Sequence, residues 1–118
     1  FRRVLFRSQA WMLRGELDRA QRLLEQALAL EPDYEVAHLA LSRLFLQRGD
    51  NTNALAVLGK FLATHPDAPG ALQQTTLILH RLGQTETAKR LGRHAVQQLE
   101  ARALDHEASA MNQILAAM

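Results

Sequence analysis

The side chains that could do chemistry are few in this chain, and they are not arranged as a reactive site. No two of the five histidines stand four residues apart on one predicted helix, so the paired-histidine metal motif is absent. These are His38, His65, His80, His94 and His106. No glycine-rich phosphate loop or nucleophile elbow occurs, and the lack of cysteine excludes disulfides and thiol catalysis. The sequence therefore predicts a protein that is not an enzyme and that holds no cofactor and no metal.

The charged residues also form no recognisable reactive or phosphate-binding site. Acidic side chains gather where helices are expected to begin, and the helix dipole favours them there without any acid–base role. Lys89, Arg90 and Arg93 form a small basic cluster, which is more typical of a solvated helix face than of a phosphate site.

The net charge depends on a doubtful segment at the start of the chain. The first eight residues, FRRVLFRS, resemble vector- or adapter-derived sequence. The chain opens on Phe1 instead of methionine, as expected of a fragment, a processed product or a conceptual translation. The whole chain has 14 basic and 12 acidic residues, whereas residues 9–118 have 11 and 12. Charge thus gives no argument for nucleic-acid binding, and no apolar run is long enough to predict membrane insertion.

A step of 34 residues organises the chain, and Gly15, Gly49 and Gly83 mark it most clearly. Three further tracks share its phase: Ala20, Ala54 and Ala88; Pro32 and Pro66; and the small residues Ser8, Ser42, Thr76 and Ala110. A fixed period of this size indicates a solenoid, in which each short unit buries its apolar face against its neighbours.

Each period reads as two helices with a turn between them. In the second period a broad apolar stripe begins at Glu35 and stops at Gly49, which can adopt the left-handed conformation that ends a helix. Asp50 is a candidate N-cap for the second helix, and Pro66 ends that helix. Each helix is about a dozen residues long, so stacking must hold the array together.

These residues resemble the tetratricopeptide repeat, a helix–turn–helix unit of 34 residues. The middle unit matches its pattern at Leu41, Ser42, Phe45, Ala54, Leu58 and Pro66. The third unit is weaker, with Gly92 at the usual aromatic position and Glu100 in place of the proline. The resemblance implies an all-α fold, a right-handed α-solenoid of antiparallel helix pairs. Its expected parts are repeats at 1–34, 35–68 and 69–102 and a C-terminal capping helix at 103–118, forming a single domain.

The small residues of the period are expected where two helices cross closely. Ser8, Ser42 and Thr76 belong to the first helices, and Ala20, Ala54 and Ala88 belong to the second helices. A bulky replacement at such a position would overpack the contact.

The C-terminal stripe changes register. Its apolar residues are Leu104, Ala108, Met111, Leu115 and Met118, whereas a continued count of 34 would place His106, Ser109 and Gln113 on the packing face. Either a separate helix begins near residues 103–105 and rotates to cap the array, or the preceding helix runs on through the missing proline. We favour the separate cap.

In tetratricopeptide proteins the first helix of each unit lines a concave groove that receives peptides. By position, the resemblance implies a groove made here by Met12, Leu39, Arg43, Leu46, Gln47, Gln73, Leu77, His80 and Arg81. Neither Arg43 nor Arg81 has a carboxylate four residues away, so these arginines are the expected contacts for an acidic peptide. Some family members clamp the carboxylate of chaperone tails, but the matching positions here supply no charge. They are Leu5, Gln9, Ala40, Gly70 and Gln74.

The leading hypothesis is a protein- or peptide-binding scaffold module within a larger assembly. The alternative is a structural or spacer segment of a longer bacterial-type protein, such as a transferase or a secretion or pilus component, whose chemistry lies elsewhere. Binding of a small molecule or of nucleic acid is a weaker third possibility, because aromatic residues are few and residues 9–118 are nearly neutral. The sequence predicts a soluble chain and leaves a cytoplasmic or a periplasmic location equally open.

Overall fold

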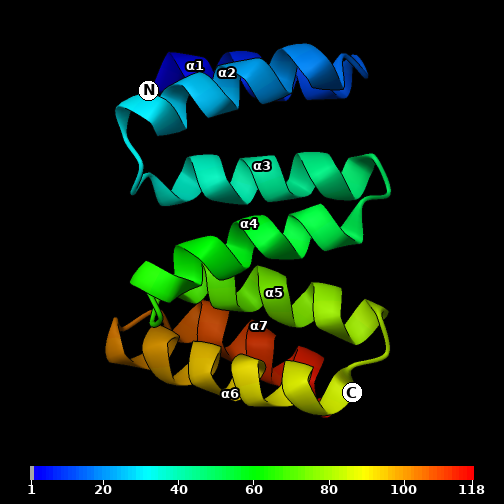
Figure 1. Cartoon of the computed structure of the whole chain (residues 1–118). Helices are drawn as coiled ribbons and strands as arrows, with labels where there is room; N and C mark the ends of the chain where they lie inside the picture. The colour runs from blue at the N-terminus through cyan, green and yellow to red at the C-terminus, as the bar shows by residue number, and fades with distance from the viewer. Residues whose placement is uncertain (1) are drawn as a thin grey trace. The chain divides into compact units, whose positions relative to one another are not determined.

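A computed structural model describes residues 2–118 as seven helices, with no strand among them (Figure 1). Their bounds are α1 Arg2–Leu13, α2 Leu17–Leu30, α3 Glu35–Gln47, α4 Asn51–Thr64, α5 Pro69–Arg81, α6 Thr85–Ala101 and α7 Asp105–Ala116. The first six form three pairs joined by short turns, and the seventh is a separate helix. The all-α prediction is confirmed.

The three glycines of the period end the first helix of each pair in the same way. Gly15, Gly49 and Gly83 have φ of 78°, 78° and 82°, in the left-handed region where a side chain would be strained. The residue after each glycine donates its amide to a carbonyl five residues back; from Asp50 to Phe45 that bond is 2.8 Å. This is the Schellman arrangement, which satisfies carbonyls left open at a helix end.

The start of α4 is capped as the sequence predicts. The Asp50 carboxylate accepts a 3.0 Å hydrogen bond from the backbone amide of Asn53. That bond satisfies one of the amides that have no partner within the first turn of a helix.

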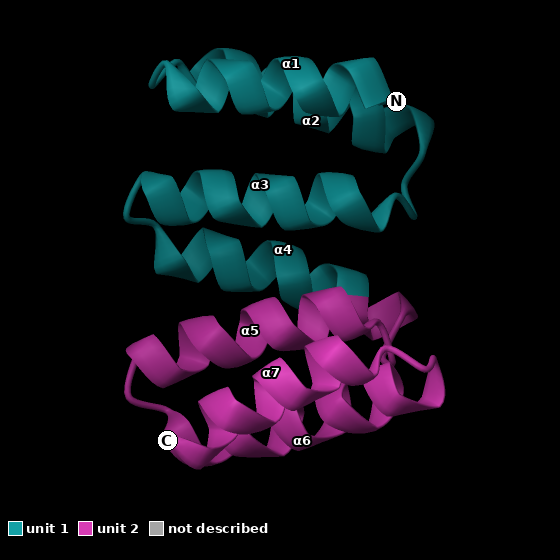
Figure 2. Ribbon diagram, turned by 180° about the vertical axis from the view of Figure 1, so that it is seen from behind, with its two compact units in different colours: residues 1–61 teal, residues 62–118 magenta. Residues whose placement is uncertain are grey.

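The chain divides into two compact units, residues 1–61 and 62–118, with the boundary inside α4 (Figure 2). In the first unit a buried cluster joins α2 and α3, where alanines let the helices approach closely and leucines fill the remaining space. Its buried members are Ala20, Leu24, Ala37, Ala40, Leu41 and Leu44.

The small residues of the first three repeats are buried, as predicted, whereas Ala110, which continues their spacing into α7, is exposed. Ser8, Ser42, Thr76, Ala20, Ala54 and Ala88 are each 0% exposed. Ser42 and Ala54 also show how close the two helices of a pair come, because the Ser42 hydroxyl donates a 3.1 Å hydrogen bond to the Ala54 carbonyl. This bond crosses from α3 to α4 inside the first unit.

In the second unit α7 packs on α6 and is separated from it by a turn, so the prediction of a separate terminal helix is confirmed. Ala108 and Met111 are buried against Val96 and Leu99 of α6. The residues that a continued 34-residue count would have placed inside are exposed: His106, Ser109 and Gln113. The helix has therefore rotated to present its own apolar stripe.

Gly92 lies where Leu115 approaches α6. A Cβ atom at Gly92 would stand 2.4 Å from the Leu115 Cδ2 atom and 3.2 Å from the Thr76 Cγ2 atom. The corresponding residues of the first two repeats, Leu24 and Leu58, are 0% exposed and fill their sites with their own side chains. In the third repeat the leucine is supplied by α7 instead.

Candidate peptide-binding surface

In the first unit the predicted groove residues of α3 fall on the side of the helix opposite its buried face. Arg43 and Gln47 are exposed, and Leu39 and Leu46 are half-buried. The spacing of four, three and one residues keeps these side chains on one side of the helix. The α3 face thus offers aliphatic surface around a guanidinium group.

The C-terminal ends of α1 and α3 meet beside this face. The Gln47 side-chain amide donates a 3.1 Å hydrogen bond to the Met12 carbonyl. Gln9, Met12, Leu13 and Gln47 line a surface pocket of about 360 Å³. Leu13 is 90% exposed, and Met12 also packs against the core of the first unit. The structure therefore brings Met12 and Gln47 together, and it adds Gln9 and Leu13, which were not among the predicted groove residues.

In the second unit the four remaining predicted residues lie on α5. Leu77, His80 and Arg81 are exposed, and Gln73 is half-buried. The opposite face of the helix is buried, with Leu72, Thr76 and Ile78 at 2% exposure or less. His80 shares a 3.3 Å hydrogen bond with the Thr85 hydroxyl across the turn to α6.

Arg43 and Arg81 are the exposed cations of these two faces, and neither bonds or pairs with another of residues 2–118. The local sequence explains this, because α5 contains no acidic residue and α3 contains only Glu35 at its first position. An unpaired guanidinium on a partly apolar surface can bind a carboxylate or a backbone carbonyl.

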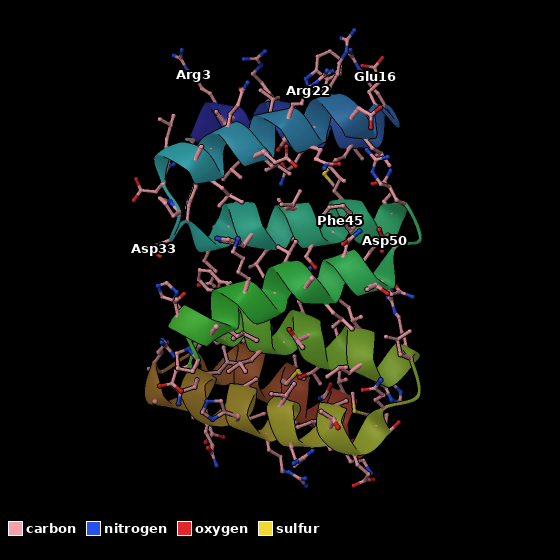
Figure 3. The ribbon with its side chains drawn as sticks, viewed as in Figure 1. Arg3, Glu16, Arg22, Asp33, Phe45 and Asp50 are labelled. Carbon is pink, nitrogen blue, oxygen red and sulfur yellow. The ribbon has the colours of Figure 1, made fainter. Side chains whose placement is uncertain are left out.

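A second charged cluster lies at the start of α2 and is paired internally. Arg48 donates a hydrogen bond to the Asp18 carboxylate, and Arg19 forms a 3.4 Å ion pair with Glu16. The hydrogen bond and the charge of Arg48 lower the pKa of Asp18 below its ordinary value. Glu16 and Arg22, both labelled in Figure 3, line the surface pocket at this cluster together with Asp18, Arg19 and Arg48. Sequence reasoning missed the Arg48–Asp18 contact, because its partners are 30 residues apart and only the fold joins them.

Trp11, the one tryptophan of the chain, is contacted by two arginines near that cluster. The guanidinium carbons of Arg19 and Arg14 lie 4.7 Å and 5.6 Å from its ring centroid. These are cation–π distances, and they connect the end of α1 to the start of α2.

Four of the five histidines, all except His106, bond to neighbouring groups, and among residues 2–118 the histidines do not gather at a metal site. His38 bonds to the Pro32 carbonyl at 2.8 Å, and His94 bonds to the Asp67 carboxylate at 2.9 Å. Among residues 2–118 no group of three histidine or acidic side chains is placed to hold a metal ion. Within the same residues, no helix combines the length and apolar character needed to cross a bilayer.

Comparison with known proteins agrees with the fold. The chain is 35% identical to cellulose synthase operon protein C of Pseudomonas fluorescens (strain SBW25) over a match of 76 residues. This match covers 64% of the chain. The match spans only 6% of the length of that relative.

Two solved structures are similar in fold. The Yersinia enterocolitica type III secretion translocator chaperone SycD has a TM-score of 0.87 at 12% identity, over 99% of this chain and 88% of that chain. PcrH in complex with the chaperone binding region of PopD has a TM-score of 0.74 at 18% identity, over 98% and 90%. The family model described as tetratricopeptide repeat matches residues 12–75, more than half of the chain. With the 34-residue period and the three glycine turns, this match shows that the chain belongs to the tetratricopeptide repeat family.

Proposed function

We propose that this chain is a non-enzymatic module that binds protein segments, on the exposed face of α3 in the first unit and on the exposed face of α5 in the second unit. Such a segment carries aliphatic side chains and at least one carboxylate. One observation carries the proposal. The guanidinium groups of Arg43 and Arg81 are exposed beside aliphatic residues, and neither has a hydrogen-bond or ion-pair partner among residues 2–118. The PcrH structure, which has the same fold and holds a region of PopD, supports the use of such a fold for binding a protein segment.

The two faces differ in what they offer. The α3 face places Arg43 between Leu39 and Leu46, both half-buried, so a ligand carboxylate would bind with apolar contacts on both sides. The α5 face places Arg81 one turn after Leu77, which is 38% exposed. Charge-assisted hydrogen bonds give orientation, and buried aliphatic contacts add affinity.

A displayed library of random peptides tests the proposal. Peptides selected on the wild-type chain are expected to be enriched in acidic and aliphatic residues. Their affinity for the Arg43→Ala/Arg81→Ala variant is expected to fall by about tenfold or more, because losing one such contact costs about 1–3 kcal/mol.

The matched control removes two arginines from another helix. Arg90 and Arg93 are exposed on α6 and have no part in the proposed surface. The Arg90→Ala/Arg93→Ala variant carries the same change of net charge and is expected to bind as the wild type does. Loss of binding in this variant alone would move the site to α6 and refute the proposal.

A second candidate function is that of a spacer segment inside a longer protein. The observation in its favour is the 35% identity to a small part of cellulose synthase operon protein C. If the chain is only a spacer, no peptide selected on it will depend on Arg43 or Arg81. An unrelated helical array of the same length would then replace it in a longer protein without loss of function.

A further inference from the structure

The turn between α6 and α7 differs from the other turns that reverse the chain. Gly15, Gly49 and Gly83 adopt positive φ at the ends of the first helices, whereas the turn at the end of α6 uses Ala103, at φ 58°. Ala103 is the one residue other than glycine with positive φ among residues 2–118. The left-handed region is unfavourable for alanine, because its Cβ crowds the backbone carbonyl.

The sequence around this turn favours a helix instead. From Arg93 to Met118 there is no glycine and no proline, and the stretch from Glu100 to Glu107 contains mainly residues that form helices readily. The third repeat has Glu100 where the first two have a proline. The helix propensity of this stretch thus favours one continuous helix over residues 85–116 and disfavours the observed turn.

Tertiary packing on α6 is what holds α7 in the observed place. Ala108 and Met111 are 3% and 2% exposed, and Leu115 reaches the recess left by Gly92. That recess accepts a leucine because the third repeat lacks the side chain that fills the same site in the first two. None of these contacts requires that α7 and α6 belong to the same copy of the chain.

We propose that α7 exchanges between two copies of this chain. In the exchanged dimer Ala103 becomes helical, α6 and α7 form one helix, and Leu115 of each copy fills the Gly92 recess of the other. Exchange keeps the packing contacts of α7 and relieves the left-handed alanine, which is the condition under which an identical element is swapped between copies. The inference is independent of the two proposed peptide-binding faces, one on α3 and one on α5.

Two substitutions at Ala103 should shift the equilibrium between the monomer and the exchanged dimer in opposite directions. Ala103→Val is expected to convert the chain to a dimer, because a β-branched residue opposes the left-handed turn more strongly than alanine does. Ala103→Gly is expected to weaken the dimer about a hundredfold, which is about tenfold for each of the two turns that form again when the dimer dissociates into monomers. Ala101→Val, at an exposed helical position two residues earlier, is the matched control and should behave as the wild type.

The measurement is light scattering after size-exclusion chromatography, on chains refolded from urea at high protein concentration. A doubled mass for Ala103→Val and an unchanged mass for Ala101→Val support exchange. A folded, monomeric Ala103→Val chain, shown by a helical circular dichroism spectrum, overturns it.

A mixing experiment decides the question even if Ala103→Val does not fold. One chain carries Gly92→Leu, which fills the recess, and the other carries Leu115→Ala, which removes the side chain that enters it. In an exchanged heterodimer each recess meets a compatible α7, so the two chains refolded together are expected to give a 1:1 dimer by native mass spectrometry. If the mixture contains no heterodimer, the proposal is wrong.

Discussion

Replacing Ala54 with leucine tests a close helix contact of the first unit. Ala54 is 0% exposed, and its carbonyl accepts a 3.1 Å hydrogen bond from the buried Ser42 hydroxyl. Leucine adds three carbon atoms at this fully buried site. To accept them, α3 and α4 must move apart or the new side chain must adopt a strained rotamer.

The expected loss of folding stability has two contributions, the overpacked site and the Ser42 hydrogen bond. Overpacking of a well-filled site costs about 1–3 kcal/mol. If the helices separate, the hydrogen bond from Ser42 is also lost, which adds about 1 kcal/mol. A total of about 2–4 kcal/mol corresponds, for a chain of this length, to a fall in Tm of roughly 8–16 °C.

Urea and thermal unfolding followed by circular dichroism measure the effect. Fluorescence of Trp11, which packs against the core of the first unit, provides a local signal. Ala56→Leu is the control, because Ala56 is exposed on the same helix and the change should stay within about 0.5 kcal/mol. If the two variants unfold at the same midpoint, the close contact assigned to Ala54 is wrong.

Further predictions concern the glycines and the Asp18 ion pair. Gly59→Ala should stabilise the chain by about 1 kcal/mol, because Gly59 is helical and an added Cβ meets nothing within 4 Å. Gly49→Ala should destabilise the chain, because φ is 78° at that position. The two substitutions should shift the denaturation midpoint in opposite directions, and shifts of the same sign would contradict the predictions. Arg48→Gln should raise the pKa of Asp18 toward its ordinary value, as followed by NMR titration of the carboxyl group. Because the pKa of Asp18 is lowered in the folded state, the ion pair stabilises the fold at pH values above the ordinary aspartate pKa, and this stabilisation is lost as the pH falls through the folded pKa. The stabilities of wild type and variant should therefore differ at neutral pH and converge in acid. Equal stability at neutral pH would show that the ion pair contributes nothing.

Much of the fold could be predicted because the period repeats local signals. A glycine at a fixed position ends each first helix, and a small residue at a fixed position marks each close crossing, so Gly49, Ser42 and Ala54 could be assigned without coordinates. The apolar spacing of the last stripe was enough to separate α7 from α6. That spacing also placed the turn near residues 103–105, but the left-handed conformation of Ala103 could not be predicted, because alanine carries no turn signal.

The candidate surface is less completely determined by sequence. Exposure of Arg43 and Arg81 follows from their place on helices whose other face is buried, and helical spacing predicts this well. The pocket beside Met12 involves Gln9 and Gln47 from different helices, so it depends on how α1 and α3 meet. For the same reason, the pairing of Asp18 with Arg48 could not be predicted from either residue alone.

The short turns of this fold have a consequence for how the chain acquires its structure. Within each unit, α1 packs on α2, α2 on α3, α5 on α6, and α6 on α7, so most packed helices are neighbours along the chain. Little loop-closure entropy has to be overcome before such contacts form, and proteins rich in local contacts fold in microseconds to milliseconds. Synthesis on the ribosome adds only about 5–20 residues per second. We therefore expect packing to keep pace with synthesis, so that each helix packs soon after the neighbouring helices that it contacts have emerged, while the rest of the chain is still being made.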